Sequence, residues 1–160
     1  MSYGFTWAPP ENKNGNVKIG FLENNDFKDS GEMDLDKTSS LTKIGNVTKD
    51  DLCVVMIYAD WCGYCKIAKP VYDEVVDEVV DDLNKVKFFK INGTGEDSMS
   101  EPTRKDDEMK LMTRIKKIAN DFEGFPSFYF FKGGKKVGKH SGDVTKEALI
   151  NSIKINSIKT

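Results

Sequence analysis

The feature that most constrains the fold is a buried strand followed directly by a long amphipathic helix. The run Cys53–Tyr58 is continuously apolar, and its β-branched and aromatic residues are typical of a strand buried on both faces. A helix is then predicted from about Cys62 to Leu83, because apolar residues recur at helical spacing, at Ile67, Val71, Val75, Val76, Val79, Val80 and Leu83. Packing has to hold this helix, since its valines give it weak intrinsic helix propensity.

The remaining elements follow from the same kinds of pattern. Val17 to Leu22 is predicted as a strand before the buried run. After the long helix we predict a strand at 86–91, an amphipathic helix ending near residue 120, a hairpin of strands at 127–131 and 136–141, and a final helix capped by Asp143 or Thr145. From residue 52 the order is β-α-β-α-β-β-α. The first two of these strands should be parallel and the last two antiparallel.

Length and charge narrow the class of protein. A chain of 160 residues suggests one domain, and we expect an N-terminal tail at 1–16 and a single domain at 17–158. The formal net charge of −2, from 24 basic and 26 acidic residues, argues against a nucleic-acid partner. No apolar run approaches the ~20 residues of a membrane span, so we expect no membrane partner. Without a secretory signal the expected localisation is cytoplasmic, with a virion-associated or a trimmed secretory protein as alternatives.

The motif that carries chemistry is Cys62-Gly63-Tyr64-Cys65, between the buried strand and the helix. A spacing of i and i+3 in the first helical turn lets two cysteines form a disulfide without backbone movement. Cys62, at the helix N-terminus, faces unpaired N–H groups and the positive end of the helix dipole, which stabilise a thiolate. The thiolate is the nucleophile of disulfide exchange. Cys65 lies one turn further in, where it is placed to attack a mixed disulfide made by Cys62.

A zinc half-site and a pair of inert core thiols are the other interpretations of this motif. A zinc site needs two more ligands, and only Cys53 and His140 are candidates. Cys53 fits a small core residue inside the buried strand, and His140 fits a surface position on the last strand. We therefore expect no metal, while inert core thiols and a redox-active disulfide between Cys62 and Cys65, which needs no organic cofactor, both stay open as interpretations of the motif alone.

Three separated motifs resemble the thioredoxin superfamily. Residues 58–66, YADWCGYCK, with Pro70 after them, resemble its active-site signature; residues 124–127, GFPS, resemble its cis-proline loop; residues 130–137, FFKGGKKV, with Gly142, resemble its closing hairpin. The lead-in to Cys62 is most similar to protein disulfide isomerase domains. The resemblance implies an α/β, thioredoxin-like fold with a central mixed sheet of four or five strands and helices on both faces.

The sequence departs from the family pattern at several places. The match is good over about residues 52–158 and poor over the segment 28–51, and residues 92–107 form a predicted loop insertion. In the family, a buried carboxylate six residues before the first cysteine accepts the proton of the second. Here that position holds Met56, and Lys90, which matches the lysine that pairs with the carboxylate, would lack its partner. Proton transfer from Cys65 then has to use water, Asp60 or another group.

The resemblance implies an enzyme, a protein disulfide oxidoreductase or isomerase. Cys62 would attack and Cys65 would resolve, and the partners would be protein substrates with disulfides or thiols and an upstream thiol reductant or oxidant. The dipeptide between the cysteines lacks both a cationic histidine and the proline of the most reducing thioredoxins, so we expect an intermediate reduction potential. The rival interpretation is a thioredoxin-fold binding module with a vestigial or regulatory disulfide, which Met56 favours. A third is a dedicated interaction through residues 92–107.

Five residues around the cysteines are the expected substrate-binding positions: Trp61, Gly63, Tyr64, Phe125 and Pro126. A cis Phe125–Pro126 bond would expose the backbone of Phe125 beside Cys62, where a substrate strand could add by main-chain pairing. The aromatic rings would form an apolar collar that receives unfolded segments.

Overall fold

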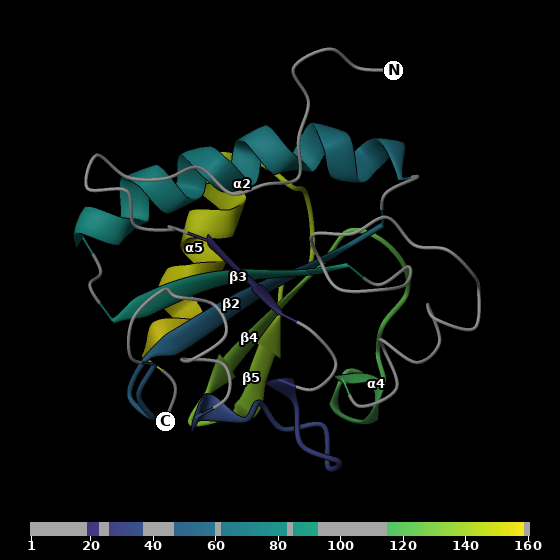
Figure 1. Cartoon of the computed structure of the whole chain (residues 1–160). Helices are drawn as coiled ribbons and strands as arrows, with labels where there is room; N and C mark the ends of the chain where they lie inside the picture. Colours follow the sequence, from purple (N-terminus) through teal and green to yellow (C-terminus); the bar gives the residue numbers. More distant parts are fainter. Residues whose placement is uncertain are drawn as a thin grey trace.

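A five-stranded mixed sheet forms the centre of the molecule (Figure 1). The computed structural model describes residues 19–22, 26–36, 47–59, 62–82, 85–92 and 115–158. The strands are β1 (Ile19–Leu22), β2 (Leu52–Tyr58), β3 (Val86–Asn92), β4 (Ser127–Lys132) and β5 (Lys135–Lys139), in the spatial order β1-β3-β2-β4-β5. Both β1 and β2 pair in parallel with β3, whereas β4 pairs antiparallel with β2 and β5. The predicted strand directions are confirmed.

The central strand is β2, and every one of its residues is buried. Alternate residues of a strand point to opposite faces, so β2 contributes to two hydrophobic clusters. One cluster contains Val54 and Met56, and the other contains Val55 and Ile57. A strand that contributes apolar side chains to both faces of the sheet must be apolar at every position. This continuous pattern made the strand predictable from the sequence.

Helices cover both faces of the sheet, as expected (Figure 1). On one face lie α2 (Gly63–Asp82) and α5 (Lys146–Ser157), which also contact each other. On the other lies the short α4 (Ile115–Ile118), through the buried Ile115. Thr145, not Asp143, caps α5, and its side chain accepts a hydrogen bond from the N–H of Ala148.

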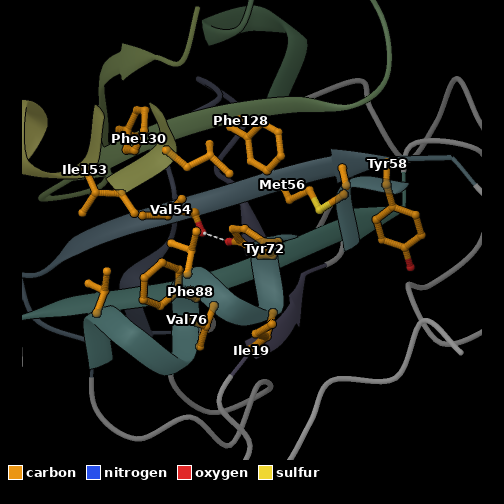
Figure 2. Close-up of a cluster of buried hydrophobic side chains, with 14 of the residues drawn as sticks. Ile19, Val54, Met56, Tyr58, Tyr72, Val76, Phe88, Phe128, Phe130 and Ile153 are labelled. Carbon is orange, nitrogen blue, oxygen red and sulfur yellow. Dashed lines mark hydrogen bonds between the residues drawn. The ribbon is translucent and has the colours of Figure 1, made fainter. Parts of the chain in front are cut away.

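Buried aromatic side chains join α2 to the sheet (Figure 2). The ring of Tyr72 packs against Phe88 and Phe128, with centroid distances of 5.9 and 5.6 Å. The Tyr72 hydroxyl lies 3.1 Å from the carbonyl of Val54 and 2.9 Å from that of Phe89, so this buried donor always has an acceptor. These contacts fix the helix over β2 and β3 and thereby fix its N-terminus, where the cysteines lie.

Part of the poorly matched segment 28–51 packs against the closing hairpin. Phe27 and Met33 form an isolated antiparallel bridge, and the N–H of Met33 donates to the carbonyl of Gly134 at 2.7 Å. Gly134 has a φ of 85°, and a Cβ built there would lie 2.8 Å from the Met33 carbonyl oxygen, so glycine is required at this contact.

Several predictions concern residues outside the described ranges. The tail at 1–16 and all but the first residue of the insertion at 92–107 lie there, and so does the beginning of the helix predicted before residue 120. The limits of the domain at 17–158 stay a prediction. Among the helices that the structure describes, none is long and apolar enough to cross a membrane.

The surface position predicted for His140 is wrong. This residue follows β5 and is only 8% exposed. Its ring meets the ring of Phe128 edge-on, Nδ1 lies 2.6 Å from the Ser152 hydroxyl, and Nε2 lies 2.8 Å from the carbonyl of Asp143. A polar residue at the end of an edge strand is buried here because α5 and the loop before it cover the ring.

Candidate active site

The two cysteines of the motif lie together at the N-terminus of α2. Cys62 immediately precedes the helix, and its N–H donates to the carbonyl of Ala59 at 3.1 Å. The backbone N–H of Cys65 points at the Cys62 sulfur, with an N···Sγ distance of 3.1 Å. Cys62 is 6% exposed and Cys65 is 0% exposed, so the predicted order of burial is confirmed.

The environments of the two sulfur atoms differ in the charge that they favour. Burial and a hydrogen bond to Cys62 both raise the pKa of the Cys65 thiol, so Cys65 keeps its proton. The Cys62 sulfur receives the backbone N–H of Cys65, a donor that favours a thiolate. The arrangement can therefore hold a nucleophile on Cys62 and a protonated thiol on Cys65.

The loop before β4 completes the surroundings of Cys62. The peptide bond between Phe125 and Pro126 is cis, as predicted. The carbonyl oxygen of Phe125 lies 3.6 Å from the Cys62 sulfur, which can donate its S–H to it. Sheet topology brings the loops together, because Ile57 at the end of β2 is paired with Ser127 at the start of β4. The predicted proximity of this loop to Cys62 is confirmed.

A pocket of about 560 Å³ opens beside the cis-proline loop. Its lining includes Phe125, Pro126, Phe128, His140 and Val144. Phe125 lines this pocket, and its carbonyl oxygen also contacts the Cys62 sulfur. The pocket therefore lies next to a residue that is in contact with Cys62.

The position expected for a buried acid is apolar. Met56 is 0% exposed and lies among Tyr58, Tyr72 and Phe128 (Figure 2). Its register partner on β3 is Lys90, which is also 0% exposed. No carboxylate on β2 therefore stands beside this lysine.

The negative charge near Lys90 comes from the helix instead. Burial lowers the pKa of Lys90 to about 8, and the Asp73 carboxylate on α2 opposes that decrease. Asp73 Oδ2 also accepts a hydrogen bond of 2.7 Å from Lys69, one turn earlier. The expectation that the family's carboxylate is absent beside Lys90 is confirmed, because Met56 holds that position, and Asp73 on the helix acts on Lys90 through its charge. The i, i+4 spacing of Lys69 and Asp73 is visible in the sequence. Their proximity to Lys90 on β3 is not, because it depends on how the helix packs on the sheet.

The other expected binding residues lie in different surroundings. Tyr64 is 76% exposed on the first turn of α2, next to the exposed Gly63. Phe125 is half-buried, and its ring packs edge-on against Phe122 at 5.2 Å. Trp61 and Asp60 lie outside the described residues. The apolar collar therefore stays a prediction.

The third cysteine is a core residue, as predicted. Cys53 is 1% exposed, and burial together with the nearby Asp51 raises the pKa of its thiol to about 12. A thiol of this kind is inert at neutral pH. Within the described ranges, no three His, Cys, Asp or Glu side chains are grouped so that they could hold a metal ion.

Comparison with known proteins agrees with this site. The thioredoxin family profile matches residues 36–105. Thioredoxin of Gallus gallus is 33% identical over 105 residues, which cover 66% of this chain and 79% of that protein. The chain belongs to the thioredoxin family.

Other relatives are of the protein disulfide-isomerase type. A protein of Schizosaccharomyces pombe that is named as a protein disulfide-isomerase is 36% identical over 104 residues, which cover 64% of this chain. The chain spans only 16% of that relative's length. Among solved structures, human ERp44 superposes with a TM-score of 0.52 at 19% identity, covering 71% of this chain and 30% of that one, which supports the fold.

Proposed function

We propose that this protein is a thiol–disulfide oxidoreductase that acts on protein substrates through Cys62 and Cys65. The observation that carries the proposal is the donation of the Cys65 N–H to the Cys62 sulfur, at the N-terminus of a 20-residue helix. This donor and the helix dipole both favour a thiolate on Cys62. The raised pKa of Cys65 keeps the second thiol protonated until it is needed.

The proposed reaction has two exchange steps. The Cys62 thiolate attacks one sulfur of a substrate disulfide, forms a mixed disulfide and releases the other substrate sulfur as a thiolate, which takes up a proton. Cys65 then loses its proton and attacks the Cys62 sulfur, which releases the second substrate thiol and forms the Cys62–Cys65 disulfide. The substrate gains two electrons and the cysteine pair loses two. A thiol reductant restores the pair, and running the steps in reverse oxidises a dithiol substrate.

Substrate binding is proposed at the loop beside Cys62. The pocket of about 560 Å³ that Phe125 and Pro126 line is large enough for residues that flank a substrate cysteine. Exposed Tyr64, on the helix side of Cys62, offers an apolar surface to the same segment. Main-chain pairing with Phe125 would give affinity with little sequence preference.

Trapping of mixed disulfides tests the assignment of the two roles. In a Cys53→Ala background, which leaves only the two motif cysteines, reduced Cys65→Ser is expected to accumulate mixed disulfides with a model substrate that contains a disulfide, because nothing displaces the substrate from Cys62. Cys62→Ser is expected to accumulate none. Nonreducing electrophoresis with peptide mapping measures both. The reverse pattern, with adducts on Cys65, would refute the assignment.

A binding module with a vestigial cysteine pair is the second candidate function, and the burial of Met56 in place of an acid is the observation that favours it. Alkylation separates the two. An exchange enzyme requires a Cys62 that reacts with iodoacetamide at pH 6, where an ordinary thiol is almost fully protonated. A Cys62 that reacts no faster than a thiol in a short peptide would favour the binding module.

A further inference from the structure

One carboxylate ties the loop between α4 and β4 to the neighbouring strands. Asp121 Oδ1 accepts a hydrogen bond from the Tyr129 hydroxyl at 3.1 Å and another from the Lys136 ammonium group at 3.0 Å. The backbone carbonyl of Asp121 accepts a third from Lys139 Nζ at 2.7 Å. Tyr129 belongs to β4, and the two lysines belong to β5. Three donors from adjacent strands therefore meet at a single loop residue.

These donors are themselves held in place. Tyr129 is 0% exposed, and the ammonium groups of Lys136 and Lys139 lie over its ring, 5.4 and 5.8 Å from the centroid. Lys136 also donates to the carbonyl of Ile118 at 3.3 Å. Burial of Asp121 opposes ionisation, but the hydrogen bonds from Lys136 and Tyr129 outweigh it and lower the pKa of Asp121. The carboxylate thus stays charged, and the anchoring persists across the neutral pH range.

The anchored residue lies four positions before the carbonyl that touches the reactive sulfur. Phe122, the next residue in the loop, donates its N–H to the carbonyl of Ala119. The rings of Phe122 and Phe125 pack edge-on, with their centroids 5.2 Å apart. Phe125 then places its carbonyl oxygen 3.6 Å from Cys62 Sγ. Movement of the loop at Asp121 would therefore be transmitted through these packed rings to the Phe125 carbonyl.

That carbonyl discriminates between the two protonation states of Cys62. Its oxygen accepts the S–H of the thiol, but it repels the negative charge of the thiolate. The Cys65 N–H, 3.1 Å from the same sulfur, has the opposite preference. The distance between the Phe125 oxygen and the Cys62 sulfur thus affects how much thiolate is present.

We propose that Asp121 is a positioning residue, which holds the Phe125 carbonyl against the Cys62 sulfur and so limits the fraction of Cys62 present as thiolate. Asp121 lines the pocket but makes no contact with the Cys62 sulfur, so its effect on Cys62 runs through the loop. The inference rests on the proposed function, because the fraction of thiolate matters only if Cys62 exchanges disulfides. It gives the loop a second task besides substrate binding, namely the tuning of nucleophile strength.

Two substitutions that change the charge in opposite directions test the proposal. Asp121→Ala removes a negative charge and all side-chain anchoring, and Lys136→Met removes a positive charge and the hydrogen bonds that Lys136 donates to Asp121 and Ile118. Both are expected to raise the rate of Cys62 alkylation at pH 6, roughly two- to fivefold for Asp121→Ala, as the loss of one hydrogen bond of modest net strength allows. The rate reached at high pH should not change. If charge alone acted on Cys62, the alkylation rate at pH 6 would instead rise in Asp121→Ala and fall in Lys136→Met.

Two matched variants separate anchoring from charge within the loop itself. Asp121→Asn loses the charge but keeps an oxygen that accepts from Tyr129 and Lys136, so its pH profile should stay close to that of the parent. Glu123→Gln loses a charge from an exposed residue of the same loop and should behave likewise. Thermal unfolding, measured in parallel, identifies any variant that reacts faster because it is unfolded.

The outcomes are distinguishable. If Asp121→Ala and Asp121→Asn have the same pH profile, or if Lys136→Met slows alkylation, the positioning role is overturned while the exchange function stands. If Asp121→Ala does not fold, the sign of the Lys136→Met change decides alone. If the parent protein itself shows no reactive Cys62 at pH 6, the proposed function fails, and the positioning role fails with it.

Discussion

The two cysteines of the motif differ by the neighbours of their sulfur atoms. Cys62 receives a backbone N–H and lies near one carbonyl, whereas Cys65 is enclosed and donates to Cys62. This asymmetry follows from helix geometry, since the first residue of a helix faces unpaired N–H groups and a residue one turn later does not. The sequence was therefore sufficient to predict which cysteine is more buried and which one meets the loop.

Met56 is buried at the position where the thioredoxin superfamily has an acid. Introducing an acid there tests how its absence affects stability and proton transfer from Cys65. Met56→Asp should lower the free energy of unfolding by about 1–3 kcal/mol, because a carboxyl group would replace a packed apolar side chain in a fully buried position. The same change should speed the breakdown of the Cys62 mixed disulfide at neutral pH, because the new group can accept the Cys65 proton. Urea midpoints and single-turnover kinetics on a peptide disulfide measure the two effects.

Met56→Leu is the matched control for this substitution. It keeps the volume and the apolar character, so it should cost less than about 1.5 kcal/mol and should leave the kinetics unchanged. If Met56→Asp neither destabilises the chain nor accelerates the reaction, the residue does not lie beneath the active cysteines in solution.

Other residue-level features had no signal in the sequence. His140 follows a strand that carries lysines, and nothing in that pattern indicated that α5 would cover its ring. Asp121 is one of many acidic residues in a chain rich in charge, and its three donors come from strands that only the folded sheet brings beside it. Contacts between distant segments depend on register and on loop path, which local periodicity does not specify.

At the scale of elements, the interface between α2 and β3 contains a charge that is costly to bury. Lys90 is 0% exposed, and burial lowers its pKa from 10.5 to about 8. Between these two pH values the unfolded chain binds the proton and the folded chain does not. The contribution of Lys90 to stability therefore rises as the pH rises from about 8 to about 10.5.

Comparison with Lys90→Met isolates this contribution. Thiols and tyrosines that titrate in the same range are present in both chains and cancel in the difference. The unfolding free energy of the wild type minus that of the variant should increase by up to about 3 kcal/mol between pH 7 and pH 10.5. Urea unfolding at several pH values measures it. A difference that is constant, or that falls with pH, would show that Lys90 keeps an ordinary pKa in the folded chain.

The elements themselves were largely predictable, and for a physical reason. β2 had to be apolar on both faces, and α2 had to be apolar on one, so both left a clear pattern. The beginning of α5 and the two-glycine turn between β4 and β5 follow from local backbone chemistry at Thr145, Gly133 and Gly134. The segment around Phe27 and Met33 was not readable, because it is held by contacts with distant segments, among them the ring of Phe131 and the carbonyl of Gly134.

At the scale of the whole molecule, the sheet brings two loops that are far apart in the sequence to the same edge. The end of β2 leads into Cys62, and the start of β4 follows the cis-proline loop. The antiparallel pairing of these strands is what places the Phe125 carbonyl beside the reactive sulfur. The same edge holds the pocket of about 560 Å³, so Cys62, Cys65 and this pocket share one end of the molecule.

The equilibrium reduction potential of the Cys62–Cys65 pair tests the central claim most directly. The protein would be equilibrated with glutathione buffers of known potential, quenched in acid and labelled with a maleimide, so that free thiols are counted by mass. We predict a two-electron transition that involves only Cys62 and Cys65, at a potential between about −270 and −180 mV, the values for thioredoxin and protein disulfide isomerase. Cys53 should stay reduced throughout. If both motif cysteines remain thiols in every buffer, or oxidise only between molecules, the pair does not form an exchangeable disulfide and the proposed function is contradicted.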